Sequence, residues 1–192
     1  MSKSITLSVA FATSLTLLSG AAHAQSAETF ADPAITNGLS TLPGSALRDA
    51  RDCLSAEGTS RAVRACTKTL KMAAPLPEVK AELYARRGLS HLSLGRYAKA
   101  AADFQAAARM DGGNKMAALG EGFAAMMRDD HATALARFSD CADDDGVAAL
   151  SAYGTAMSHH MQGNIDDARA AYAQALSLRP GWDAVEEQLA LL

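Results

Sequence analysis

Aromatic side chains are scarce in this chain: they account for 5% of its 192 residues, with a single tryptophan. Most of the remaining hydrophobic residues are Ala, Leu and Met, which are good helix formers. The composition therefore favours closely packed helices over a β-sheet. A large excess of charge is missing too, because the net charge is −3. The chain thus lacks the basic surplus typical of proteins that bind nucleic acid or a membrane surface.

Signature motifs of enzymes are also missing. The sequence contains neither G-x-S-x-G nor H-E-x-x-H. The stretch 120–125 resembles part of a dinucleotide-binding loop, but no strand is expected before it. The acidic stretch 140–146 resembles a calcium loop, yet Cys141 stands at its first ligand position and no glutamate at its twelfth. We expect no catalytic residue and no cofactor, and we interpret 143–145 as a turn that caps a helix beginning near Val147.

The chain has no apolar run long enough for a comfortable transmembrane helix. The mostly apolar stretch 5–18 is too short and too often interrupted by Ser and Thr. It follows Lys3 and precedes the small-residue site 22–24, which together indicate a secretory signal peptide over 1–24, cleaved before Gln25. The alternative is a retained N-terminal anchor. We expect a periplasmic or secreted mature protein that does not insert into the membrane.

What the sequence does contain is a pattern that recurs every 34 residues. Within 81–114, Ala100 is followed four residues later by Phe104, and the same Ala-x3-aromatic spacing recurs in 115–148 and in 149–182. This period and this spacing are those of the tetratricopeptide repeat family, which the chain resembles.

The resemblance implies an all-α fold: a right-handed α-solenoid of antiparallel helix pairs, with about 3.5 repeats plus a C-terminal capping helix. A flexible linker rich in Pro, Gly and Asn is expected over 25–44, followed by a degenerate repeat over 45–76. The three regular repeats are 81–114, 115–148 and 149–182, and the terminal helix is 183–192. In the first regular repeat we expect helices over about 77–94 and 97–110.

Two positions in the first helix of each repeat depart from the family pattern. At the first, the family usually has Leu, and this chain has Arg87, Glu121 and Thr155. At the second, the family usually has Tyr, and this chain has His91, Ala125 and His159. These changes leave the expected fold intact, but they weaken any inference about the partner from the family alone.

Only three cysteines are present, and no C-x-x-C spacing supports a zinc or thioredoxin-type site. Cys53 and Cys66 are nearly equidistant from an expected turn at 59–60, where Ser60 is the expected helix N-cap. An antiparallel helix pair places them at the same height, which favours a disulfide in an oxidising compartment. Two buried free thiols are the alternative. Cys141 occupies a small packing position of its repeat, so we expect a buried free thiol there.

The resemblance also implies where a partner binds, because in this family the first helices of the repeats line a concave groove. The matching positions are Glu82, Ala85, Leu89, Leu92 and Ser93; Met116, Leu119, Phe123, Met126 and Met127; and Leu150, Tyr153, Met157, His160 and Met161. Family members that grip a C-terminal carboxylate have Lys, Asn and Arg there, whereas these side chains are mostly apolar. Flexible thioethers adapt to varied apolar ligands, so we expect an apolar or amphipathic segment of a partner protein. The alternative is that part of this stripe is buried inside the solenoid or under the linker.

Two other functions remain open. The stretch 157–161 combines Met and His, which suit copper, and further candidate ligands are His91, Met126, Met127 and His131. However, the adjacent His159 and His160 point about 100° apart on a helix. The other function is self-association: 46–110 has 12 Lys and Arg against 6 Asp and Glu, whereas 111–192 has 5 against 13. A solenoid would therefore have one basic end and one acidic end. The alternatives for this uneven charge are an ordinary solvated surface and binding to a dipolar partner.

Overall fold

The structure is a computed structural model that describes residues 33–192 except 41, 56–57 and 73–75. All regular structure in these residues is helical. The helices are α2 (Pro33–Ser40), α3 (Gly44–Ser55), α4 (Ser60–Lys71), α5 (Pro77–Ser93), α6 (Tyr97–Met110), α7 (Lys115–Met126), α8 (His131–Ser139), α9 (Ala148–Gln162), α10 (Ile165–Leu178) and α11 (Asp183–Ala190). The expected all-α fold is confirmed, and α5 and α6 begin and end within a residue of the bounds expected from the sequence.

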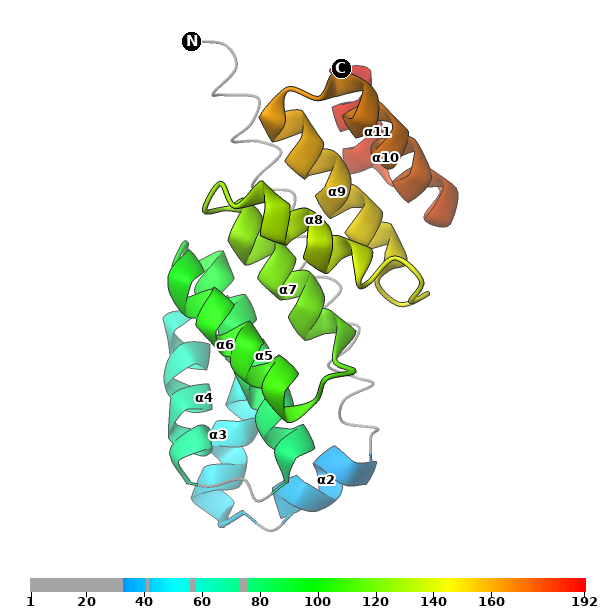
Figure 1. The fold of residues 1–192 in the computed structure, drawn as a ribbon. Coiled ribbons are helices and arrows are strands. Elements are labelled where there is room, and N and C mark those ends of the chain that lie inside the picture. Colours follow the sequence, from blue (N-terminus) through cyan, green and yellow to red (C-terminus); the bar gives the residue numbers. More distant parts are fainter. Residues whose placement is uncertain (1–32, 41, 56–57, 73–75) are drawn as a thin grey trace.

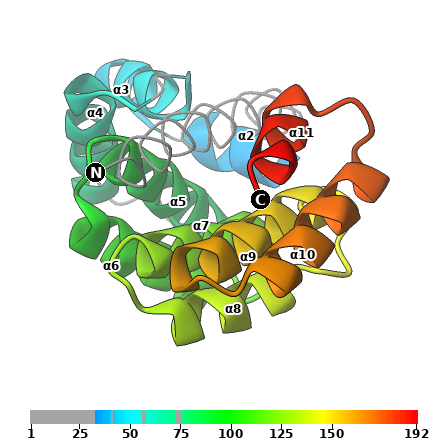
Figure 2. The same ribbon diagram turned by 90° about the horizontal axis from the view of Figure 1, so that it is seen from above.

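From α3 to α10 the helices form four antiparallel hairpins, each packed on the next (Figure 1). Seen from above, the hairpins follow an arc (Figure 2). Helices α5, α7 and α9, the first helices of the regular repeats, lie on the inner side of this arc, and α6, α8 and α10 lie on its outer side. Because α7 contacts both α5 and α9, the inner helices form one continuous layer. The expected signal peptide, 1–24, and the first part of the expected linker lie outside the described residues.

Phenylalanine rings set the spacing between the repeats. The buried ring of Phe104, on α6, lies against Gly88 of α5 and Gly120 of α7, and a Cβ atom at either glycine would overlap it. In the next repeat the same arrangement involves Phe138, Gly122 and Gly154. We call these two rings the aromatic wedges. Each wedge requires glycine in its own repeat and in the following one, so the helices approach closely where the rings insert.

The turns inside the three regular repeats each contain a residue with positive φ. Gly95 (φ 69°) and Gly163 (φ 80°) adopt it readily, since glycine has no Cβ. In the second repeat Asp129 takes this conformation (φ 61°), which is uncommon for a residue with a side chain. The next residue, Asp130, accepts a hydrogen bond from the N–H of Thr133 at 3.1 Å and so caps α8. The hydrogen bonds that Asp130 accepts from the side chain and the backbone of Thr133 lower its pKa.

Two expected helix caps are wrong in detail. The N-cap of α4 is Thr59, whose hydroxyl accepts from the N–H of Ala62 at 3.1 Å, because Ser60 is already the first helical residue. The acidic turn before α9 does not cap that helix with a side chain. Asp144 instead accepts from the N–H of Gly146 at 3.1 Å, within the turn itself.

Helix α2 contradicts the expectation of a flexible linker, as far as the described residues go. Ile35, Leu39 and Leu42 are buried in a cluster with residues of α3, α4 and α5. Their spacing of four and three residues is helical, but the nearby Pro, Asn and Gly obscured it in the sequence. Gly38 allows the close packing, because a Cβ there would overlap Val79 of α5.

The first hairpin, α3–α4, is closed by the disulfide between Cys53 and Cys66, which confirms the pairing proposed from the sequence. Both cysteines are buried, and small residues at Ala50 and Ala62 are fully buried beside them in the same hairpin. Closing a loop of this length stabilises the folded chain by about 3 kcal/mol through the lost entropy of the unfolded chain. The stabilisation acts on a terminal hairpin that has a regular repeat on only one side.

Helix α11 covers the last regular repeat, as expected for a terminal helix. The ring of Trp182, just before α11, is 4% exposed. Its centroid lies 5.2 Å from that of Tyr153, which in turn lies 5.9 Å from that of Tyr172. Leu189 is half-buried against the same core. The apolar end of the third repeat is therefore closed by side chains of the chain itself.

Candidate functional site

The stripe expected to line a concave groove is brought together on the inner helices, but part of it belongs to the core. Of the ten residues proposed as the site, the buried ones are Leu92, Phe123, Met126, Tyr153 and Met157. The half-buried ones are Glu82, Leu89, Met127, His160 and Met161. The other positions of the stripe are buried except for the half-buried Ser93: they are Ala85, Met116, Leu119 and Leu150.

Aromatic contacts explain two of the buried positions. The ring of Phe123 meets Phe138 edge to face at 5.0 Å between centroids, and Tyr153 packs against two further rings. By contrast, Leu89, Met127 and Met161 contact the core and keep part of their surface exposed. One such apolar side chain lies in each regular repeat.

The other side of these helices carries polar contacts between repeats. In the first regular repeat, Arg87 donates from Nε and Nη2 to the two carboxylate oxygens of Asp103 at 2.8 and 2.6 Å. Its Nη1 donates to the hydroxyl of Thr67, on α4, at 3.1 Å. The hydrogen bond to Asp103 raises the pKa of Arg87. Burial lowers the pKa of His91, although its Nε2 lies 4.0 Å from Asp103.

The second repeat has a corresponding set with the charges exchanged between the helices. Gln105 on α6 donates from Nε2 to Glu121 on α7 at 3.0 Å. On the other side, Nε of Arg137 on α8 lies 3.3 Å from Glu121. We use the name polar triad for the three side chains that meet here, one from the preceding helix and one from each helix of the repeat. The first triad is Thr67, Arg87 and Asp103, and the second is Gln105, Glu121 and Arg137.

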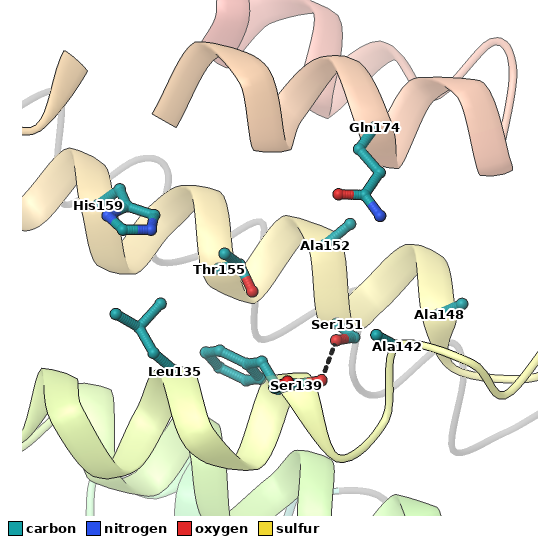
Figure 3. Close-up of a pocket in the computed structure, with 10 residues that line it drawn as sticks. Leu135, Ser139, Ala142, Ala148, Ser151, Ala152, Thr155, His159 and Gln174 are labelled. Atoms are coloured by element: carbon teal, nitrogen blue, oxygen red, sulfur yellow. Dashed lines mark hydrogen bonds between the residues drawn. The ribbon is translucent and has the colours of Figure 1, made fainter. Parts of the chain in front are cut away.

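In the third repeat the residues 34 positions after the second triad are Ser139, Thr155 and Ala171. All three side chains are short, and a cavity of about 310 Å³ lies beside the first two, between α8, α9 and α10. Figure 3 shows Leu135 and Ser139 on one side of the cavity, Gln174 on the other, and α9 along its length. At one end, Nδ1 of His159 is buried with no hydrogen-bond partner among the described residues. The cavity therefore lies beside two of the positions that long polar side chains, Gln105 and Glu121, occupy in the second repeat.

This cavity and the apolar stripe lie on opposite faces of α9. Successive residues of a helix are rotated by about 100°. Thr155 and His159, which line the cavity, are each two positions away from the stripe residues Met157 and Met161, hence about 200° away around the axis. The two sites are thus accessible from different sides of the solenoid.

Sequence reasoning identified only part of the cavity. Thr155 and His159 depart from the family pattern; the sequence suggests no role for Thr155 and only a possible copper ligand for His159. Ser139 and Gln174 were not identified. The sequence does contain a sign of the cavity, because the three long side chains of the second triad are all replaced by short ones 34 positions later. Recognising a cavity also required knowing that the three positions meet in space.

The histidines considered as copper ligands do not converge. His131 Nδ1 lies 3.0 Å from the hydroxyl of Ser158, and His160 meets the ring of Tyr172 edge to face at 6.5 Å. Burial lowers the pKa of His160. His159 lines the cavity on the opposite face, and His91 lies beside Asp103. Within the described part of the chain, no group of three or more His, Cys, Asp or Glu is arranged to hold a metal ion.

Cys141 is a buried free thiol, as its packing position indicated. It follows α8, and its Sγ donates to the carbonyl oxygen of Lys115 at 3.5 Å. Burial raises the pKa of this thiol to about 11, so the reactive thiolate is disfavoured. Cys141 is therefore a packing residue in the folded chain.

Stacked hairpins, a 34-residue period and aromatic wedges together define an α-solenoid of helical repeats. Residues 81–114 and 119–184 match two family models, both described as tetratricopeptide repeat. The chain belongs to the tetratricopeptide repeat family. Proteins of this family generally act as non-catalytic scaffolds for protein–protein interactions. No helix in the described ranges has the length and apolar character needed to cross a membrane.

The fold is similar to that in the crystal structure of MamA, with a TM-score of 0.58 and 23% sequence identity. The match covers 68% of this chain and 74% of that chain. At this identity the likeness concerns the fold alone. No curated protein matches the chain.

Proposed function

We propose that the protein is a non-catalytic adaptor of the bacterial cell envelope that binds an apolar or amphipathic segment of a partner protein on the inner face of its solenoid. Membership of the family supports the adaptor role. The choice of face rests on one observation: each regular repeat leaves an apolar side chain half-buried there, at Leu89, Met127 and Met161. Apolar surface left exposed on a repeat protein usually binds a protein or peptide.

The location in the envelope rests on the sequence of the first 24 residues, with Lys3, an apolar stretch and a small-residue cleavage site. The Cys53–Cys66 disulfide supports it, since such bonds persist in oxidising compartments. N-terminal sequencing of the protein from its native host tests the proposal. A mature chain that begins at Gln25 in the periplasmic fraction or the medium is expected, and an uncleaved chain in the cytoplasm would refute it.

The groove is tested with substitutions at exposed members of the stripe. Met126 is only 1% exposed, so a charge there would report on folding and not on binding. Met127→Asp/Met161→Asp places two carboxylates on the inner face. Met110→Asp, at a side chain that is 42% exposed at the end of α6, makes the same chemical change elsewhere. Circular dichroism verifies that each variant keeps its helices.

Tagged forms of the unchanged chain and of both variants are used to capture partners from an envelope fraction, followed by mass spectrometry. We expect specific partners of the unchanged chain to be lost by the double variant and kept by Met110→Asp. Retention of the same partners by a correctly folded double variant would show that the inner face is not the binding surface.

A second candidate function is head-to-tail self-association, favoured by the distribution of exposed charge. Helices α3 and α4 carry the exposed cations Arg48, Arg51 and Arg64, and α11 carries the exposed anions Asp183, Glu186 and Glu187. These helices lie at opposite ends of the solenoid (Figure 1). Complementary charges on distant ends steer the association of copies.

Charge reversal separates this function from adventitious association. Reversing the three cations to Glu, or the three anions to Lys, leaves both ends with one sign of charge. Each variant alone is expected to be monomeric in analytical ultracentrifugation at low salt, and an equimolar mixture of the two is expected to associate. A mixture that stays monomeric under conditions where the unchanged chain associates would refute an end-to-end contact.

A further inference from the structure

The third repeat differs from the second in a way that points to a missing group. In the second repeat the guanidinium of Arg137 reaches Glu121 and completes the polar triad. At the corresponding position the third repeat has Ala171, and the space beside Ser139 and Thr155 is a cavity. We propose that this cavity binds the guanidinium group of an arginine side chain supplied by a partner protein.

The lining of the cavity offers hydrogen-bond acceptors. A guanidinium has five N–H donors and no acceptor, so it needs acceptors around it. Ser139 and Thr155 contribute hydroxyl oxygens, and Gln174 contributes a carboxamide. Nδ1 of His159, buried without a partner among the described residues, accepts a hydrogen bond when the ring carries its proton on Nε2. An inserted arginine therefore satisfies a buried atom that the described residues leave without a hydrogen-bond partner.

Apolar surface lines the rest of the cavity and suits the stem of the same side chain. Leu135 and Phe138 form one wall, and Ala148 and Ala152 lie along α9. The three methylenes of arginine pack favourably on apolar surface while its charged head makes polar contacts. A volume of about 310 Å³ also accommodates the planar head, which a lysine ammonium would not fill in the same way.

Acidic side chains beside the cavity, and not its lining, favour a cation. None of the described lining residues is charged. Three arginines lie within five residues of the lining in sequence: Arg137 pairs with Glu121 and Asp140, Arg169 lies 3.8 Å from Asp166, and Arg179 lies over the ring of Trp182. The loop between the lining residues 142 and 148 carries three aspartates, two of them exposed. This acidic loop, which joins the lining residues Ala142 and Ala148, attracts a positively charged side chain.

The site is independent of the proposed inner groove, because it opens on the opposite face of α9. A partner that inserts an arginine here contacts the outer layer, α8 and α10, and leaves the apolar stripe free. Substitutions in the cavity and in the stripe therefore separate the two proposals, and either can fail without the other.

The test uses a small probe and nuclear magnetic resonance of the ¹⁵N-labelled protein. N-acetyl-L-arginine N-methylamide is titrated, and the amide shifts of α8, α9 and α10 are followed. N-acetyl-L-citrulline N-methylamide, which has nearly the same shape but no charge, is the matched control. We expect saturable shifts centred on Thr155 and His159, with affinity for the citrulline probe about tenfold weaker, since hydrogen bonds to charged groups are the stronger ones.

Variants decide whether the shifts come from the cavity. Ser139→Gln/Thr155→Glu/Ala171→Arg transfers the triad of the second repeat into the third, and Ala152→Leu fills the same space with a single apolar change. Both are expected to abolish the response to the arginine probe. Absent shifts with the unchanged protein, an equal response to citrulline, or a response retained in a folded filled variant would each overturn the proposal.

Discussion

Arg87 and Asp103 form a largely buried ion pair where the family usually has an apolar contact. Their side chains are 19% and 8% exposed. Removing two charges from water is expensive, so the two hydrogen bonds between them mainly offset that penalty. The net contribution of such a pair is small, whereas breaking it leaves one charge buried without its partner. The pair thus contributes more to the specific packing of α5 against α6 than to the free energy of unfolding.

Removing one partner of the Arg87–Asp103 pair should therefore cost more than removing both. Asp103→Ala is expected to lower the free energy of unfolding by about 3–5 kcal/mol, because the Arg87 guanidinium loses its carboxylate. Arg87→Leu/Asp103→Ala is expected to lose much less, since it removes both charges and restores the usual Leu. Urea unfolding followed by circular dichroism compares the two. Equal losses would mean that packing, and not charge, governs this contact.

Cys141 is expected to respond slowly to alkylation. The folded chain holds its thiol protonated up to a pKa of about 11, so at pH 8 iodoacetamide should modify it only after unfolding in guanidinium. The sign of the linked pH effect follows. The unfolded thiol loses its proton near pH 9 and the folded one near 11, so stability present below pH 9 is lost as the pH rises towards 11.

Mass spectrometry measures the alkylation, and thermal unfolding between pH 8 and 11 measures the linkage. Cys141→Ala is the control, because it should reduce the pH dependence of the melting temperature over this range. Rapid alkylation of the native chain at pH 8 would show that the thiol is not held in a buried, protonated state.

Among the helices, the aromatic wedges are the contacts that join one repeat to the next. Phe104 and Phe138 reach across each boundary to a glycine of the following first helix, at Gly120 and Gly154. Glycine inside a helix is normally unfavourable by about 0.5–1 kcal/mol relative to alanine. Its presence at both boundaries indicates that the close approach of ring and backbone outweighs this loss.

Gly120→Ala is accordingly expected to destabilise the chain by about 1–3 kcal/mol, because the new methyl group overlaps the Phe104 ring. Gly44→Ala is the matched control: a Cβ there meets nothing within 4 Å, so little change is expected. Adding Phe104→Leu to Gly120→Ala should recover part of the loss. Thermal or urea unfolding gives the comparison, and a stabilising effect of Gly120→Ala would contradict the wedge.

The elements also show what the sequence can and cannot predict. α5 and α6 were predictable because a regular period, Pro77 at the first helical position and Gly95 in the turn all agree. Helix α2 was not, since its apolar spacing is short and its turn-forming residues suggested a linker. The cavity was not predictable for a different reason. It is a volume bounded by side chains of α8, α9 and α10, and the sequence does not show that these side chains meet in space.

At the scale of the whole molecule, the chain is a series of hairpins in which each contacts mainly its neighbours. In such an array, stability is close to a sum of repeat and interface contributions. The Cys53–Cys66 bond lies in the first hairpin, far along the chain from α9 and α10. Its effect should therefore be local and fade with distance along the solenoid.

Cys53→Ser/Cys66→Ser tests this view. The pair of substitutions is expected to reduce the stability of the first hairpin by about 3 kcal/mol. Hydrogen exchange should accelerate in α3 and α4 and remain nearly unchanged in α9 and α10. Uniform acceleration along the whole chain would instead show that the solenoid unfolds as a single cooperative unit.

The wedges finally constrain how an array of this kind can lengthen by gene duplication. The unit 115–148 has Gly120 in its first helix, where it receives the ring of the preceding repeat, and Phe138 in its second helix, which inserts into the following repeat. In a tandem copy of this unit, the phenylalanine of one copy would therefore pack against the glycine of the next. The unit 149–182 trails with Tyr172, whose buried hydroxyl has no hydrogen-bond partner among the described residues. Gln188 lies 34 residues after Gly154, so a larger residue stands where a glycine would pack against the Tyr172 ring. Copies are therefore tolerated in the middle of the molecule, and the third unit is built as a terminus.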